Sequence, residues 1–348
     1  MKKVLHINTN KHWRGGEQQV DYLFNAPYTN VECYLYCREN TALANKNKSK
    51  PNIFTFKKKL GIGIKAAIQL KKICNENKID ILHLHDSKAL TIYYLAYYFL
   101  GLRCLVIIHR HLTFPITSKW KYKHKSVSKI IAVSNAVKKT LIPFISSEKI
   151  NIIYPAIELT KFTQNNKATL RTEINANKNE TIIGIVAALE KEKNIASFLN
   201  IAALYQQQGY THQFVIIGEG SMEKEFKTQY TLSNIHFMGF RKDIENLLPD
   251  FDIFLFTSIN DSFGIVILEA MAAKVPVVSL KYPAVNELIE NNLNGNIANN
   301  ITECIEYINK LISNKTFKEN ISNNAYNFVQ KFDVKSMTNE IEKIYHQI

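Results

Sequence analysis

Residues 181–220 read TIIGIVAALEKEKNIASFLNIAALYQQQGYTHQFVIIGEG and hold one complete strand–helix–strand unit. The runs 181–187 and 213–217 are short, apolar and rich in β-branched residues, which predicts two buried strands. Residues 195–208 between them have the length and composition of a helix. Because parallel strands need a crossover connection, which is usually a helix, this unit predicts a parallel α/β sheet.

The same alternation of strands and helices continues along the chain in both directions. Further strands are expected over 4–8, 31–37, 52–56, 79–85, 103–109, 129–133, 150–153, 235–237, 253–256 and 277–280. Further helices are expected over 62–75, 89–100, 135–142, 243–248, 266–273 and 334–348.

The polar segment 163–179 divides this pattern into two series. We therefore predict an α/β fold of two Rossmann-like domains whose parallel sheets face each other across a cleft, where such folds bind ligands. The expected domains are residues 1–165 and 176–332, and an end helix over 333–348 could pack back on the first of them.

The length and composition agree with two α/β domains. The chain has 348 residues, of which 46% are hydrophobic, and this suits two soluble cores. The longest apolar stretch, 89–108, is interrupted by Gly101 and Arg103 and is interpreted as a buried helix and a strand rather than a membrane span. Residues 4–8 are too short for the core of a signal peptide. Five cysteines without paired spacing indicate neither a zinc site nor a disulfide framework, so a cytoplasmic location is expected.

Charge is distributed unevenly between the two halves of the chain. Residues 1–175 contain 29 Lys and Arg against 10 Asp and Glu, whereas residues 176–348 contain 15 against 20. The basic first half predicts an anionic partner, which could be a phospholipid surface, an anionic acceptor or nucleic acid. The lysines are spread out, and neither an interleaved motif of aromatic residues that stack on bases nor a known nucleic-acid-binding motif lies among them. This argues against nucleic acid as the partner.

Two features of the second half could bind a nucleotide diphosphate. Gly218 and Gly220 follow an expected strand and precede a helix, where glycine lets a ligand approach the backbone and helix amides bind anions. Lys191 and Lys193 follow another strand and could neutralise phosphate. Both features also have structural interpretations, since Gly-x-Gly often marks a tight turn and loop lysines are usually solvated.

A third feature begins at Asp261. The backbone amides of Phe263, Gly264 and Ile265 stand at the start of an expected helix, where amides lack partners and can bind anionic or hydroxyl oxygens. Glu269 lies about two helical turns beyond Asp261, so the two carboxylates can address opposite ends of an elongated ligand. A carboxylate accepts two hydroxyl hydrogen bonds, which suits a ribose diol. The alternative is a helix cap at Asp261 and an ordinary helical glutamate.

In their order along the chain these motifs resemble the retaining glycosyltransferases of family 4, which have the GT-B fold. The resemblance covers nearly the full length of the chain. In the second half it is carried by Ala187–Lys193, Gly218–Gly220, His236–Gly239, Asp261-x7-Glu269, Pro283–Glu287 and Asn294-Gly295. In the first half it is carried by Trp13–Glu17, His109-Arg110-His111 and Ile130–Ser134.

The resemblance implies roles for the candidate residues of the second half. It implies that Asp261 and the amides after it bind the donor sugar, that Glu269 binds the ribose and that Lys193 binds the diphosphate. It places Arg241 near the base. The family usually has arginine where this chain has Ala188, so Lys193 would carry more of the charge on the diphosphate. Asp261 is one methylene shorter than the usual glutamate, which could change the preferred sugar.

In the first half the resemblance places Gly15 and Gly16 by the donor phosphates and the acceptor. It places an active-site histidine at His109 or His111, which alternation along an extended segment puts on the same face. His83 and His85 also alternate to one face and are interpreted as structural or acceptor-side residues.

The expected function is transfer of a sugar from a nucleotide diphosphate donor to a hydroxyl of a glycan or glycolipid in cell-envelope polysaccharide or lipopolysaccharide synthesis. The resemblance implies retention of anomeric configuration with no metal and no other cofactor, and no Asp-x-Asp at a strand end offers a divalent-ion site. The alternatives are a GT-B epimerase or phosphorylase and, in a different class, a basic nucleic-acid-binding protein.

The expected location is the inner face of the cytoplasmic membrane. The predicted helix over 89–100 carries Tyr93, Tyr94, Tyr97 and Tyr98 within the basic half of the chain. Part of this helix must be core, but tyrosines and lysines also suit a membrane interface. The sequence therefore predicts reversible binding of the N-terminal domain to anionic lipid, which would present a lipid-linked acceptor.

Overall fold

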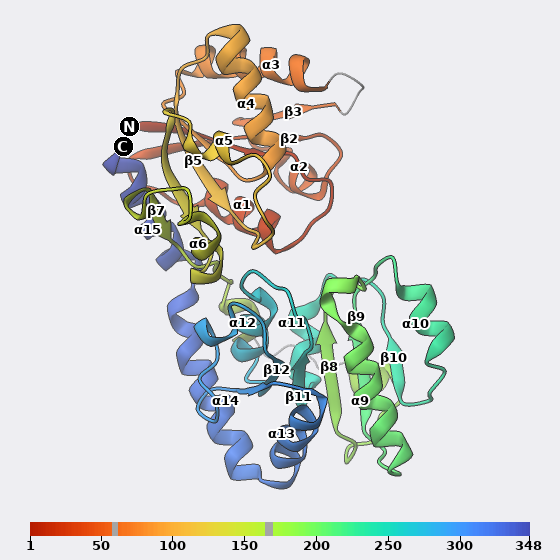
Figure 1. Cartoon of the computed structure of the whole chain (residues 1–348). Helices are drawn as coiled ribbons and strands as arrows, with labels where there is room; N and C mark the ends of the chain where they lie inside the picture. Colours follow the sequence, from red (N-terminus) through yellow and green to blue (C-terminus); the bar gives the residue numbers. More distant parts are fainter. Residues whose placement is uncertain (58–61, 164–169) are drawn as a thin grey trace. The chain divides into compact units, whose positions relative to one another are not determined.

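The described part of the chain folds into two compact units. In this computed structural model that part comprises residues 1–57, 62–163 and 170–348. The first unit contains Met1–Ala156 and Val334–Ile348, and the second contains Ile157–Asp333 (Figure 1). The prediction of two α/β units with parallel sheets is confirmed.

The second unit begins ahead of the polar segment 163–179, in which the sequence pattern placed the domain boundary. Residues 164–169 of that segment lie outside the described residues. Its described remainder includes a short helix, α8 (Leu170–Glu173).

Among the described residues, the first unit has a sheet of seven parallel strands in the order β3-β2-β1-β4-β5-β6-β7. The strands are β1 (Lys2–Asn8), β2 (Val31–Arg38), β3 (Ile53–Phe56), β4 (Ile81–Leu84), β5 (Leu105–Arg110), β6 (Val127–Ala132) and β7 (Ile150–Ile152). The helices are α1 (Gly15–Asn25), α2 (Ala42–Asn47), α3 (Ile62–Asn77), α4 (Ser87–Leu100), α5 (Lys119–Lys123), α6 (Asn135–Leu141) and α15 (Val334–Gln347).

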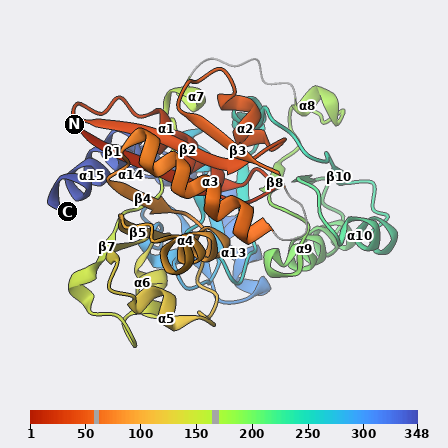
Figure 2. The ribbon, with the colours of Figure 1, turned by 90° about the horizontal axis from the view of Figure 1, so that it is seen from above.

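The two faces of this sheet are covered by different helices. On one face Leu82 and Ile108 share a core with α3 and α4, which lie side by side (Figures 1 and 2). On the other face Val4 and Ile81 share a core with α1 and with α15, the last helix of the chain. Because helices cover both faces, the central strands are largely apolar runs, which is why the sequence predicted them well.

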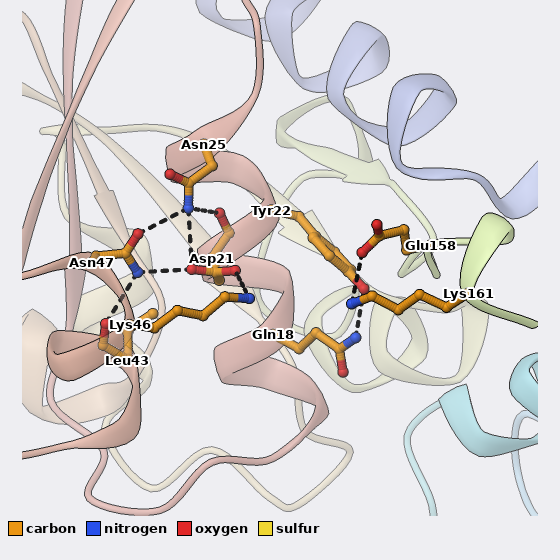
Figure 3. Close-up of polar contacts among 9 residues, drawn as sticks. All are labelled: Gln18, Asp21, Tyr22, Asn25, Leu43, Lys46, Asn47, Glu158 and Lys161. Atoms are coloured by element: carbon orange, nitrogen blue, oxygen red, sulfur yellow. Dashed lines mark hydrogen bonds and ion pairs between the residues drawn. The ribbon is translucent and has the colours of Figure 1, made fainter. Parts of the chain in front are cut away.

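Polar side chains join α1 to α2 near the glycine loop, residues 13–17. Asp21 is almost fully buried, and its carboxylate accepts hydrogen bonds from Lys46 Nζ and Asn47 Nδ2, both at 2.7 Å (Figure 3). Lys46 Nζ also lies 5.3 Å from the centre of a Trp13 ring. A buried carboxylate is tolerated when it is paired, so these contacts tie the middle of α1 to α2.

Among the described residues, the second unit has a sheet of six parallel strands in the order β10-β9-β8-β11-β12-β13. The strands are β8 (Ile182–Val186), β9 (Gln213–Ile217), β10 (Ile235–Phe237), β11 (Ile253–Phe256), β12 (Val277–Leu280) and β13 (Asn296–Ala298). With α8, the helices are α7 (Thr160–Thr163), α9 (Ile195–Gln207), α10 (Glu223–Gln229), α11 (Ile244–Leu247), α12 (Ile265–Ala272), α13 (Ile301–Ser313) and α14 (Lys315–Val329).

Candidate active site

Two predicted site residues of the second unit form an ion pair. Lys193 Nζ lies 2.5 Å from Asp261 Oδ2, and 25% and 17% of their side chains are exposed. They belong to the loops that follow β8 and β11, which are neighbouring strands. A cation and a carboxylate therefore meet at the carboxyl edge of the sheet, where open α/β sheets bind their ligands.

The turn that carries Lys193 is held by the residue that follows β11. Thr257 Oγ1 donates a hydrogen bond to Lys193 O at 3.1 Å, and Asn194 Nδ2 donates to Thr257 O at 3.3 Å. Asn194 precedes α9 with a φ of +50°, which asparagine adopts more readily than most residues. These contacts hold the backbone of Lys193 in one position.

Gly264 shapes the start of α12. Its φ is +98°, and a Cβ there would lie 2.6 Å from Tyr282 Oη, so only glycine fits. Tyr282 Oη donates to Phe263 O at 2.6 Å. The prediction of an unpaired Phe263 amide is wrong, because this amide donates to Asp261 Oδ1 at 3.1 Å. The amides of Gly264 and Ile265 donate to no acceptor among the described residues.

Glu269 lies on α12 and is partly buried. Burial, and next the carboxylate of Glu245, raise the pKa of Glu269 to about 7, while Lys161 acts in the opposite direction. Glu245 belongs to α11 and Lys161 to α7, and α7 contacts both α11 and α12. The raised pKa makes Glu269 a candidate functional residue.

Gly218 and Gly220 are required by loop packing. Gly218 has a φ of +141°, and a Cβ there would lie 1.9 Å from Ala187 O; a Cβ on Gly220 would lie 2.5 Å from Leu189 O. The amide of Gly218 donates to Gly239 O at 2.8 Å and so is not available to a ligand. The close approach that these glycines allow is between the loops after β8 and β9.

Arg241 is engaged with two carboxylates. Its guanidinium donates to Asp243 at 2.8 and 2.6 Å and to Glu173 at 2.6 and 3.2 Å. Hydrogen bonds to Asp243 and then to Glu173 raise the pKa of Arg241, and Arg241 in turn lowers the pKa of Asp243. These bonds tie the loop after β10 to α8. A role of Arg241 at the base stays a prediction.

In the first unit the glycine loop leads into α1, which begins at Gly15. A Cβ built on the next residue, Gly16, would lie 3.9 Å from the ring of His111. Glu17 closes the Trp13–Glu17 motif, but no role was predicted for it. Its side chain is buried and fixes the loop, accepting hydrogen bonds from Arg14 N at 3.1 Å and from Asn10 Nδ2 at 2.6 Å. An acidic residue at the third position of a helix often caps the helix start. This pattern could have predicted the role of Glu17.

Among the described residues, five histidines gather near the carboxyl ends of β1, β4 and β5. They are His6, His83, His85, His109 and His111. The rings of His109 and His111 stack with centroids 4.3 Å apart, and those of His83 and His85 with centroids 4.4 Å apart, which confirms the predicted alternation of each pair to one face. The cluster arises because β1 and β5 are the two neighbours of β4 in the sheet.

Burial keeps these imidazoles neutral. It lowers the pKa of His6 to about 3 and that of His111 to about 4, and it also lowers the pKa values of His83, His85 and His109. A neutral imidazole can donate and accept hydrogen bonds but carries no charge to neutralise a phosphate. Histidines of this kind suit contact with an acceptor hydroxyl better than contact with the diphosphate.

The sequence did not predict one member of this cluster, His6, or a tyrosine that contacts it, Tyr345. His6 lies on β1 with its Nδ1 3.1 Å from His85 Nε2. Tyr345 lies on α15, and its hydroxyl is 2.7 Å from His83 Nδ1. No local pattern joins Tyr345 to His83, since the two residues are 262 positions apart and meet only through the packing of α15.

Comparisons with known proteins identify the family of the chain. Residues 166–328 match the family described as "Glycosyl transferases group 1", and residues 14–161 match "Glycosyltransferase Family 4". The chain is 25% identical over 305 residues to the UDP-Gal:alpha-D-GlcNAc-diphosphoundecaprenol alpha-1,3-galactosyltransferase of Escherichia coli, covering 81% of this chain and 79% of that protein. It is 30% identical over 164 residues to the amylovoran biosynthesis glycosyltransferase AmsK of Erwinia amylovora, covering 44% of this chain and 39% of that protein.

Solved structures show the same fold. Anabaena Alr3699/HepE, crystallised with UDP and glucose, has a TM-score of 0.86 at 21% identity, with both chains covered completely. A glycosyltransferase from Rickettsia africae ESF-5 has a TM-score of 0.85 at 20% identity, covering 99% of this chain and 98% of that one. With two matched families that span most of its length, the chain belongs to glycosyltransferase family 4 and is a glycosyltransferase of the GT-B fold.

Proposed function

We propose that the chain transfers a sugar from a UDP-sugar to a hydroxyl of a lipid-linked glycan, with retention of anomeric configuration and without a metal ion. The observation that carries this proposal is the Lys193–Asp261 pair beside the unpaired amides at the start of α12. The Escherichia coli relative is named for a UDP-galactose donor and a diphosphoundecaprenol-linked acceptor, and the Anabaena protein was crystallised with UDP-glucose.

In this mechanism the protein stabilises the leaving diphosphate. Lys193 and the amides of Gly264 and Ile265 present positive charge and dipoles to the oxygens that become more negative as the sugar leaves. Asp261 accepts hydrogen bonds from sugar hydroxyls once Lys193 turns toward the phosphates. The departing phosphate takes the acceptor proton on the same face of the sugar, so retention needs no protein base.

The proposal is tested by binding and by product analysis. After chelation with EDTA, calorimetric titration with UDP, GDP and ADP should show preferential binding of UDP, and transfer should persist in EDTA. The anomeric configuration of the product, determined by NMR, should match that of the donor. Inversion, or activity that EDTA abolishes, would overturn the mechanism. Conversion of the donor without an acceptor would instead support an epimerase, and phosphorolysis a phosphorylase.

Glu269 should make nucleotide binding depend on pH. Ribose hydroxyls bind the ionised carboxylate best, so binding must remove the proton that Glu269 holds below its pKa of about 7. We expect the affinity for UDP to rise up to about tenfold per pH unit below this pKa and to level off above it.

The raised pKa of Glu269 also affects stability, because the folded state binds more protons than the unfolded state. The contribution of Glu269 to stability is therefore complete below about pH 4.5 and is lost as the pH rises to about 7.

The matched control is Glu269→Gln, which keeps the size of the side chain but cannot ionise. Calorimetry with UDP between pH 5.5 and 8 should show a flatter profile for the variant, and the remaining slope reports the ionisation of UDP itself. At pH 8 the variant should bind more weakly by roughly 1.5–3 kcal/mol, the usual cost of losing hydrogen bonds to a charged group. A wild-type to variant affinity ratio that does not change with pH would remove Glu269 from the ribose site.

We also propose that the first unit binds anionic lipid through the exposed side of α4 and α5. The structure buries Tyr93, Tyr94 and Tyr97, so they belong to the core, whereas Tyr98 is exposed. Phe99 and Trp120 are 80% and 52% exposed. No helix among the described residues is both long enough and apolar enough to cross a bilayer.

Exposed lysines accompany these aromatic side chains. Lys119, Lys123 and Lys125 are exposed on or beside α5, and Lys121 Nζ lies 5.8 Å from a Trp120 ring centre. Aromatic rings with nearby cations are the composition of a membrane-interface site, where each basic residue contributes about 1 kcal/mol.

Reversing two of these charges should release the protein from anionic vesicles. For Lys123→Glu combined with Lys125→Glu, co-sedimentation with phosphatidylserine-containing liposomes at low salt should show affinity reduced by at least about tenfold. The control combines Lys178→Glu with Lys224→Glu, two exposed lysines of the second unit, and should leave binding unchanged. Equal losses in both variants would show a response to net charge alone and would contradict a site on α4 and α5.

A further inference from the structure

The histidine cluster of the first unit contains more imidazoles than contact with one acceptor hydroxyl requires. Three of its ring nitrogens, His6 Nε2, His83 Nε2 and His109 Nδ1, are buried and have no hydrogen-bond partner among the described residues. Buried polar atoms without partners are uncommon, because each costs the free energy of its lost hydration. The orphaned Nδ1 of His109, which lies beside His85 and His111, indicates that this part of the cluster binds something beyond the protein itself.

The outer part of the cluster has the spacing of a metal site. One ring nitrogen from each of His85, His109 and His111 lies within 4.8 Å of the other two. His85 Nδ1 and His111 Nε2 are 3.4 Å apart. This is long for a hydrogen bond between two nitrogens. It is close to the separation of two ligands around tetrahedral zinc, about 3.3–3.4 Å for Zn–N bonds of about 2.0–2.1 Å.

We propose that His85, His109 and His111 form a binding site for one divalent transition-metal ion of the zinc type. Neutral imidazole is the protonation state that ligates such ions. Three histidines leave one tetrahedral position for water or for an added ligand. This inference concerns the first unit and does not depend on the proposed transfer reaction.

Contacts behind the outer site support it. With an ion on His85 Nδ1, the Nε2–H of the same ring would donate to His6 Nδ1, which lies 3.1 Å away. A partner of this kind fixes the tautomer and orientation of a metal-bound histidine. One ring nitrogen from each of His6, His83 and His85 also lies within 4.8 Å of the other two, but all three side chains are buried. His111 is partly exposed and gives an ion access to the outer site from solvent.

The test measures zinc binding to the full chain without a histidine tag, stripped of metal with EDTA and kept free of nucleotide and acceptor. Calorimetry should show about one Zn²⁺ per chain, and Co²⁺ in its place should give the strong absorption of a tetrahedral nitrogen site. His111→Ala should bind Zn²⁺ at least about tenfold more weakly, since even the loss of a residue behind a ligand costs roughly 10–100-fold. His111 is partly exposed, so this variant should fold, and circular dichroism checks that it does.

Two further variants make the result specific. His6→Gln, which removes the partner of His85, should also weaken zinc binding by about 10–100-fold. His346→Ala, at an exposed position of α15 outside the cluster, should bind as the wild type does. Zinc should raise the melting temperature of the wild type and of His346→Ala but not that of His111→Ala. If the wild type binds no more tightly than His111→Ala, the site does not exist and any zinc is bound elsewhere on the surface.

Discussion

Lys193→Ala is expected to lower turnover by roughly 10²–10³-fold, the usual cost of removing one group that stabilises a leaving oxyanion. The side chain has two functions that alanine abolishes. It supplies a positive charge at the carboxyl edge of the second sheet, and it neutralises Asp261 at 2.5 Å. Because Ala188 stands where the family usually has arginine, we expect no second cation to replace it at that position. Without Lys193 the carboxylate of Asp261 would repel the diphosphate.

Stability should change much less than activity. The pair is partly exposed, and ion pairs in such positions contribute about 1 kcal/mol or less. Lys191→Ala is the matched control, since Lys191 lies on the same short turn and is exposed. The measurement is the kcat of both variants at saturating donor, with thermal unfolding of each. A loss of less than about tenfold for Lys193→Ala would assign the phosphate to another residue.

A second substitution separates the two functions of Lys193. Asp261→Asn removes the negative charge and leaves Lys193 unpaired. If Lys193 acts mainly on the phosphate, nucleotide affinity should be kept or improved in this variant while sugar transfer falls. In the double variant the losses should not add, because the two residues are in direct contact.

The fold could be predicted where apolar runs are long enough to show whether they are typical of a strand or of a helix. The strands that were expected are all present, and the central ones, such as β4, β11 and β12, are buried on both faces. Strand β13 escaped because Asn296–Ala298 is short and begins with a polar residue. Helix α1 escaped because two glycines open it and polar residues, Glu17 and Asp21 among them, lie buried within it. Such polar burial depends on partners that are distant in sequence and leave no local signal.

The candidate site could be predicted only in part for the same reason. Lys193 and Asp261 were each recognisable from motifs, but their pairing depends on β8 and β11 being neighbours in the sheet. The histidine cluster likewise depends on the order β1-β4-β5, which places His6 and His109 on either side of β4. Strand order is a property of the tertiary fold. A single sequence therefore indicates which residues have side chains suited to binding or catalysis, but not which of them lie in contact.

Gly218→Ala is expected to be the most destabilising single substitution proposed for this protein. A Cβ at Gly218 would lie 1.9 Å from Ala187 O, far inside van der Waals contact, and the φ of +141° is one that alanine rarely adopts. The carbonyl cannot move aside easily, because the Ala187 amide is itself hydrogen-bonded to Ile217 O at 3.0 Å. Backbone strain and overpacking each cost about 1–3 kcal/mol, so we expect a loss of roughly 3–5 kcal/mol in the free energy of unfolding.

Gly209→Ala separates the two causes, because Gly209 has a φ of +81° but nothing within 4 Å of its Cβ position. This control should lose only the conformational part, about 1–2 kcal/mol. Urea denaturation of both variants, followed by fluorescence and circular dichroism, measures the difference. Nucleotide binding should fail in Gly218→Ala only to the extent that the second unit unfolds, since the amide of Gly218 is already bonded to Gly239 O. A Gly218→Ala protein that is as stable as Gly209→Ala yet does not bind nucleotide would show instead that this glycine lies against the ligand.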